Sequence, residues 1–374
     1  MRDPQAPRRT RGMAPAASAV SGFLQSQELA KALRPHLAKV HWVGVVGPQV
    51  AGVTQVEAVK GFVERHQYAN FIHGAERAAA ADAASHLAGA KPQPVRPYLP
   101  TPAVSEDELQ AIHEASLTIL KEIGMDFLHE EAKAILKAAG ADVDPSSDRV
   151  RFDKALIESK IGLAPKEFTL HARNPARNVQ IGGNAVAFCS VGSAPNSADR
   201  GPGNFHDYKN FMRLGQSLDA VHVWGGYPVE PVDVHASIRH LDALGAMLTL
   251  SDKPIHAYSL GKQRNLDALE MVRLARGIDQ ETLDREPSVF TIINSSSPLK
   301  LDTPMLEGII QMAQRNQPVV LTPFTLAGAM APVTVVGAVA QQNAEALAGL
   351  VFHQSVRAGA PFVYGGFTSN VDMK

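Results

Sequence analysis

The chain has 374 residues, of which 45% are hydrophobic, 20% charged and 6% aromatic, the balance of a soluble globular protein. Its formal net charge of −1 excludes an overall basic field that would attract nucleic acid or an anionic membrane, and no apolar run of about 18 residues predicts a membrane span. The single cysteine, Cys189, excludes a disulfide within the chain and a cysteine-rich zinc site, and it agrees with the cytoplasmic location that we predict.

Residues 1–95 are predicted to be a disordered or poorly defined amino-terminal extension. The first 20 residues contain arginines among Pro, Ala and Ser but lack the apolar core of a signal peptide, so we expect a disordered head rather than a targeting signal. The apolar spacing allows short helices over 56–66 and 75–88. The prolines between 92 and 102 then form a stiff boundary, and residues 96–374 are predicted to form one domain.

A helical lead-in is predicted to open this domain. Ser105 and Glu108 have the spacing of a capping box, the apolar residues from Leu109 to Ile123 follow a helical stripe, and Gly124 ends it. Further helices are predicted over 130–139 and 152–161.

Strands and helices then alternate to the end of the chain. The runs 179–181 and 185–191 are predicted to be strands joined by a turn at Gly182-Gly183-Asn184. Later strands are predicted over 220–227, 254–260, 288–294, 318–323 and 361–364. The helices between them are predicted over 207–217, 234–250, 265–276, 303–315 and 333–357.

This alternation predicts an α/β fold with a parallel sheet, because short apolar strands separated by helices are buried on both faces. A doubly wound sheet and a TIM barrel fit the pattern equally well. No Gly-x-Gly-x-x-Gly motif follows the first strand, which favours the barrel. We count about six core strands where a closed barrel has about eight, so the barrel is expected to be incomplete or to depart from the standard fold.

The candidate site lies at the carboxyl ends of the strands, where barrel enzymes place their active sites. The side chains there are aromatic, hydroxyl and amide groups with few charges, which suits a cation, especially a quaternary ammonium, better than a phosphate. The alternative is that the aromatic rings only cap the barrel core. The candidate substrate-binding residues are Tyr227, Glu230, Tyr258, Asn294, Ser295, Phe324, Tyr364, Phe367 and Asp372.

Several catalytic motifs are absent from the sequence. There is no His-Glu-x-x-His, no P-loop and no Gly-x-Ser-x-Gly, and Cys189 is expected to be a buried structural thiol rather than a nucleophile. Asp233 and His235 begin a cobalamin-binding Asp-x-His-x-x-Gly pattern, but Ile238 occupies the glycine position. We therefore expect no metal site and no corrinoid held by a histidine of this chain.

The stretches 327–334, 341–349 and 364–374 resemble the trimethylamine methyltransferase (MttB) family, and so does the lead-in over 112–124. The resemblance covers residues 96–374. It implies a TIM-barrel methyltransferase of one-carbon metabolism, related to the enzymes of methanogenesis, that moves a methyl group from a methylated amine to a corrinoid. The cobalamin would be supplied by a separate corrinoid-binding protein.

The resemblance also implies a substrate class and roles for the site residues. Founding members use pyrrolysine to act on tertiary amines, whereas most members lack it, so we expect a quaternary amine such as a betaine. Tyr227, Tyr258, Phe324, Tyr364 and Phe367 would then form an aromatic cage. Glu230 or Asp372 would balance the ammonium charge, and Asn294 and Ser295 would hold a substrate carboxylate.

Family members are longer than this chain, so its carboxyl-terminal part is expected to be missing. Two alternatives stay open: an inactive barrel fragment, and another small-molecule TIM-barrel lyase or decarboxylase that needs no corrinoid protein. Homo-oligomer formation is also left open.

Overall fold

The computed structural model describes residues 93–98, 102, 104–192, 194–196 and 201–370. The predicted disordered head, the helices predicted over 56–66 and 75–88, and Asp372 lie outside the described residues. No helix in the described part of the chain combines the length and the apolar character that crossing a membrane requires.

The lead-in begins with the predicted capping box. The Ser105 side chain accepts a hydrogen bond from the Glu108 N–H at 3.3 Å, and the Glu108 carboxylate accepts one from the Ser105 N–H at 2.8 Å. Helix α4 (Glu106–Thr118) continues as a π-helical turn, η1 (Ile119–Ile123). It ends at Gly124, whose φ is 78° and where a Cβ would lie 2.4 Å from the Val150 carbonyl oxygen. Glycine is therefore required there.

A small four-stranded sheet follows, where the sequence indicated helices alone. Its strand order is β2-β3-β1-β8, and β1 pairs with β3 antiparallel and with β8 parallel. These strands have only two or three residues and lie outside any longer apolar run, so the sequence pattern did not predict them. The elements are β1 (Met125–Phe127), α5 (Glu130–Ala138), β2 (Asp142–Val143), β3 (Arg149–Arg151), α6 (Lys154–Ile161) and β8 (Lys300–Leu301).

An antiparallel hairpin comes next, and here the predicted pairing was wrong. Strand β5 (Val179–Gly182) pairs with β4 (Glu167–Leu170), with the 3₁₀ turn η2 (Pro175–Arg177) between them. The run 185–191, predicted as its partner across the Gly182-Gly183 turn, instead makes a parallel bridge to Val223 through Cys189.

Four of the predicted parallel strands are present and lie side by side in chain order, whereas the runs 185–191 and 220–227 contribute only isolated bridges to this sheet. The order is β11-β9-β7-β6, and bridges between Trp224 and Ile255 and between Cys189 and Val223 extend it. In a doubly wound sheet the order of the strands reverses at a switch point. The described parallel strands follow one another without such a reversal. The α/β class is confirmed, while closure into a barrel stays a prediction. The strands are β6 (Ile255–His256), β7 (Val289–Ile293), β9 (Val319–Leu321) and β11 (Phe362–Tyr364).

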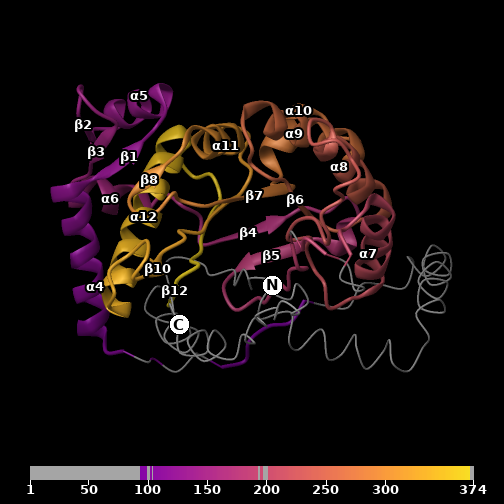
Figure 1. The fold of residues 1–374 in the computed structure, drawn as a ribbon, viewed down its shortest axis with the longest axis horizontal. Coiled ribbons are helices and arrows are strands. Elements are labelled where there is room, and N and C mark those ends of the chain that lie inside the picture. Colours follow the sequence, from indigo (N-terminus) through magenta and orange to yellow (C-terminus); the bar gives the residue numbers. More distant parts are fainter. Residues whose placement is uncertain (1–92, 99–101, 103, 193, 197–200, 371–374) are drawn as a thin grey trace, which may run out of the picture.

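Helices form an arc around these strands and the β4–β5 hairpin, as Figure 1 shows. Most were predicted within a few residues, but α8 begins at Arg239 rather than at 234, and α10 was missed. The helices are α7 (Phe205–Ser217), α8 (Arg239–Leu250), α9 (Lys262–Arg276), α10 (Gln280–Arg285), α11 (Thr303–Gln314) and α12 (Val335–Val356).

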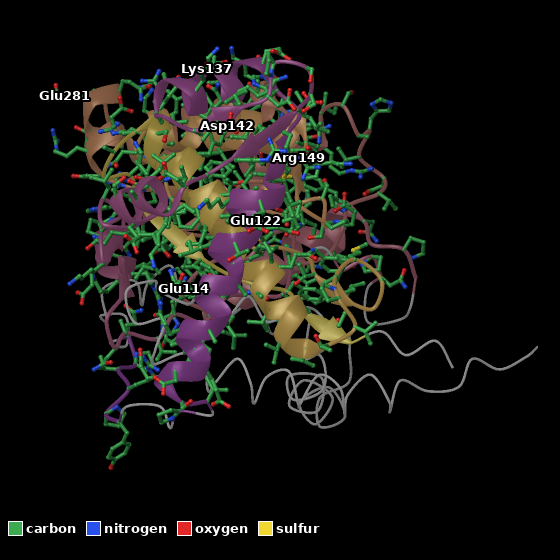
Figure 2. The ribbon with its side chains drawn as sticks, turned by 90° about the vertical axis from the view of Figure 1, so that its left-hand side faces the viewer. Glu114, Glu122, Lys137, Asp142, Arg149 and Glu281 are labelled. Carbon is green, nitrogen blue, oxygen red and sulfur yellow. The ribbon has the colours of Figure 1, made fainter. Side chains whose placement is uncertain are left out.

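Helix α12 is buried along most of its 22 residues, because it packs against α4, α5, α6, α11 and the strands. Its apolar residues therefore surround the helix axis, as expected of a central helix. Figure 2 looks onto the side where α4 and the small sheet lie, with Glu122 and Arg149 among the labelled residues.

Residues of the parallel strands alternate between two apolar layers. One layer faces the helices and includes Ile255, Val289 and Leu321. The other joins the inner strand face to the β4–β5 hairpin, and its buried members are Leu170, Val179, Ile181, Val223, Phe290, Val320 and Val363. Each fully buried side chain of this size contributes about 1.5–3 kcal/mol, so these two layers are a principal source of the fold's stability.

Two fully buried histidines predict a loss of stability in acid. Burial lowers the pKa of His256 from 6.5 to about 4 and that of His353 to about 3. The unfolded chain therefore binds more protons below pH 6.5, and stability falls as the pH drops from there toward 4, by up to about 1.4 kcal/mol per pH unit for each histidine. Urea denaturation at about pH 7 and about pH 5 measures this loss. His353→Leu should make the pH dependence shallower, and an unchanged dependence would contradict the assignment.

Candidate functional site

The carboxyl ends of the parallel strands lie at one edge of the sheet, and the strand alternation decides which side chains face inward there. Phe290, Val320 and Val363 belong to the inner layer. Asn294 directly follows Ile293 of β7, so the alternation places Asn294 on the inner side. Tyr258, Phe324 and Phe367 lie beyond the ends of β6, β9 and β11, and Tyr258 packs against the first layer. The same alternation directs Ser295 and Tyr364 toward the helices.

Tyr227 and Tyr258 form an aromatic pair. Tyr227 follows the bridge at Trp224, and Tyr258 follows β6. Their ring centroids lie 4.6 Å apart with an interplanar angle of 71°, and Tyr208 of α7 packs against Tyr227 at 5.6 Å. The Tyr227 N–H donates to the Tyr258 hydroxyl oxygen at 3.0 Å. Burial raises the pKa of Tyr227 above its usual value of 10, so its phenol is neutral near neutral pH.

Phe324 and Phe367 follow β9 and β11 and stack on each other. Their centroids are 4.7 Å apart and the planes differ by only 9°. Strands β10 (Leu326–Ala327) and β12 (Ser369–Asn370) pair in parallel just beyond them, and the Thr325 and Thr368 hydroxyls share a hydrogen bond of 2.5 Å. The stacked pair is therefore fixed from both strands.

Asn294 and Ser295 follow β7 but make different contacts. The Thr322 hydroxyl donates to the Asn294 side-chain oxygen at 2.6 Å, and Asn294 is exposed. No described residue accepts a hydrogen bond from the Asn294 side-chain nitrogen. Ser295 is buried, and its hydroxyl donates to Glu345 of α12.

Two further candidates are engaged within the fold. Glu230 forms a 2.7 Å ion pair with Arg239, so its charge is already balanced. Tyr364 is only 2% exposed, and its hydroxyl donates to the Asn343 side-chain oxygen at 3.2 Å. Their proposed roles as counter-charge and cage wall stay predictions, as does that of Asp372.

Two buried polar residues near these strand ends are not among the predicted substrate-binding residues. His256 packs against Tyr258 with centroids 4.6 Å apart, and its Nε2 accepts the Ile292 N–H at 3.1 Å. Glu345 is completely buried in α12. Glu345 is the only acidic residue in 335–356, a stretch without lysine or arginine, and this is a detectable signal because fully buried carboxylates are rare.

Neither a thiol nucleophile nor a metal centre is supported by the described residues. Burial raises the pKa of the Cys189 thiol from 9.0 to about 12, so the group stays protonated and fits the predicted structural role. Although the residue is only partly buried, its sulfur is crowded, since a Cβ at Gly225 would lie 2.6 Å from it. In the described part of the chain, no three His, Cys, Asp or Glu residues gather as metal ligands would.

The family model for trimethylamine methyltransferase (MTTB) matches residues 73–374. The chain belongs to this family. The predicted resemblance is therefore confirmed, and the match begins ahead of residue 96, where the domain boundary stays a prediction.

Curated relatives in the MTTB family carry methyltransferase names. A glycine betaine methyltransferase of Desulfitobacterium hafniense (strain Y51) is 35% identical over 275 residues, which cover 72% of this chain and 57% of the relative. A trimethylamine methyltransferase MttB of D. hafniense (strain DSM 10664 / DCB-2) is 28% identical over 72% of this chain and 55% of its own length. A proline betaine:corrinoid methyltransferase of Eubacterium limosum is 28% identical over 72% and 57%. The chain thus spans about half the length of these relatives.

Proposed function

We propose that this chain binds a methylated amine, most favourably a quaternary betaine, and takes part in transferring one methyl group to a corrinoid held by a separate protein. The observation that carries the proposal is the group of aromatic and amide side chains, Tyr258, Asn294, Phe324 and Phe367, that follows the ends of the parallel strands in a member of the MTTB family. The parallel strands follow one another in the sheet in the same order as in the sequence. This order supports the further proposal that they belong to a TIM-type barrel.

The aromatic groups suit a permanent cation. A quaternary ammonium cannot donate a strong hydrogen bond, and its charge is stabilised on an aromatic face by about 0.5–2 kcal/mol per ring. Tyr227 and Tyr258 on one strand pair, and Phe324 and Phe367 on another, supply such rings. Because the Tyr227 phenol is neutral, it adds no charge of its own.

The exposed Asn294 suits the other end of a betaine. Its side-chain oxygen is occupied by Thr322, so its amide nitrogen can donate to a carboxylate. Ser295 is less suited, because its hydroxyl is already directed to Glu345. We therefore assign the carboxylate contact to Asn294 alone.

In the proposed reaction the C–N bond of the substrate breaks and its electron pair stays on nitrogen. A quaternary amine leaves as a neutral tertiary amine, so no acid is needed to protonate the leaving group. The task of this chain is then to orient the methyl group and to exclude water.

The corrinoid would supply the nucleophile that accepts the methyl group, and the described residues do not fit a corrinoid held by this chain. His235 lies on the surface with its Nδ1 hydrogen-bonded to the Ser237 hydroxyl at 2.8 Å, and Ile238 replaces the motif glycine. This supports a partner protein as the holder of the cofactor.

Proton NMR of the full chain incubated with glycine betaine and reduced cobalamin tests the proposal. Dimethylglycine should form only when protein and cobalamin are both present. No dimethylglycine above the protein-free control would overturn the methyl transfer. Consumption of betaine without cobalamin would instead support the lyase or decarboxylase alternative, and a broad, aggregating thermal transition would support the inactive fragment.

A further inference from the structure

Glu345 is a buried carboxylate whose hydrogen bonds hold the segment at the candidate site. Its side chain has no exposed surface, and no lysine, arginine or histidine of the described residues forms an ion pair with it. Removing a charge from water without a counter-ion is costly unless hydrogen bonds compensate. The bonds that compensate therefore show what this residue holds together.

Four donors surround the Glu345 carboxylate, and three of them come from residues 295–299. One oxygen accepts the hydroxyls of Ser295 and of Ser297, the latter at 2.6 Å. The other accepts the Leu299 N–H at 2.8 Å and the Gln341 side-chain amide at 2.9 Å. The segment between β7 and β8 is thus tied to the central helix α12.

This segment starts directly after Asn294. Its first residue, Ser295, points away from the inner face and toward α12, so fixing Ser295 also fixes the direction in which Asn294 projects. Thr322 holds Asn294 from the neighbouring strand at 2.6 Å. Asn294 is therefore positioned from two sides, one of which depends on Glu345.

We propose that Glu345 is a positioning residue for carboxylate recognition, acting on the substrate through the 295–299 segment and Asn294. The inference rests on the proposed function, in which Asn294 holds the carboxylate of a betaine. A carboxylate suits the task better than an amide, because four donors need acceptors on both side-chain oxygens. In Glu345→Gln an NH₂ group would face donors at one of the two positions.

The test compares two ligands that share the cation but differ in the carboxylate. Calorimetry measures glycine betaine and tetramethylammonium binding to the full chain, to Asn294→Ala and to Glu345→Gln. Glu345→Gln should weaken glycine betaine about tenfold, the effect of losing a hydrogen bond to a charged group, and leave tetramethylammonium unchanged. A residue with a purely structural role would lower both affinities together or neither.

Gln317 provides a matched control at the opposite end of β7. It is also completely buried and also makes four hydrogen bonds, to the Ser288 and Val289 N–H groups and to the Leu283 and Arg315 carbonyls. Gln317→Ala should lower the melting temperature without changing the ratio of the two affinities. If Glu345→Gln behaves in the same way, the inference is overturned.

Two further outcomes keep the inference separate from the proposed function. Ser297→Ala removes one donor, and it should lower glycine betaine affinity selectively even if Glu345→Gln does not fold. A selective loss in Asn294→Ala together with wild-type ratios in the Glu345 and Ser297 variants would overturn the inference alone. Failure of the wild-type chain to bind either ligand would overturn the proposed function and the inference with it.

Discussion

Replacing Tyr258 or Phe324 with alanine is expected to weaken glycine betaine binding about tenfold each, since a desolvated cation–aromatic contact contributes about 1–2 kcal/mol. Both rings follow parallel strands, and each is paired with a second ring, Tyr227 or Phe367. Calorimetric titration of glycine betaine measures the loss in each variant.

Two controls separate recognition of the cation from general damage. Tyr258→Phe keeps the ring and removes only the hydroxyl that accepts from the Tyr227 N–H, so most of the affinity should remain. Tyr98 is 83% exposed, and Tyr98→Ala should leave binding unchanged. If Tyr258→Ala and Phe324→Ala both bind glycine betaine like the wild type, the aromatic cage is wrong.

Gly215→Ala is expected to lower the free energy of unfolding by about 1–3 kcal/mol, because the added methyl group overpacks the core. A Cβ at Gly215 of α7 would lie 2.3 Å from the Trp224 ring. Trp224 cannot move away readily, since it is only 1% exposed and its ring N–H donates to the Ser251 hydroxyl at 2.7 Å. Urea denaturation measures the change.

Gly245 in α8 gives the opposite expectation. A Cβ there would come no closer than 3.8 Å to its nearest neighbour, Met271. Gly245→Ala should therefore stabilise the chain by about 0.5–1 kcal/mol through helix propensity alone. Equal effects of the two substitutions would mean that the packing described between α7 and Trp224 is incorrect.

The parallel strands could be predicted from the sequence because they are buried on both faces. Runs such as 288–294 and 318–323 are mostly apolar and lie between helices, and β7 and β9 lie within them. Strands β1, β2, β3 and β8 could not be predicted, because their two or three residues do not lie within a longer apolar run and pair only through the tertiary fold. The strand partner predicted from the Gly182-Gly183 turn was wrong for a related reason. Strand β5 pairs with the preceding strand β4, to which it is joined by a longer connection.

The candidate site was predicted from strand-end position, and its details depend on side-chain direction. Alternation separates Asn294, which faces inward, from Ser295, which bonds to α12. Tyr364 occupies a helix-facing position for the same reason, and its hydroxyl reaches Asn343. Glu345 lies on a helix rather than at a strand end, so strand-end reasoning could not reach it.

The claim that this site recognises a quaternary ammonium is tested most directly by comparing glycine betaine with tert-butylacetate in calorimetric titrations of the full chain. The two ligands share shape and carboxylate, and only the nitrogen cation of betaine is replaced by neutral carbon. We predict that glycine betaine binds at least about tenfold more tightly, because only the cation is stabilised by the aromatic faces. Equal affinities, or tighter binding of tert-butylacetate, would contradict recognition of the cation.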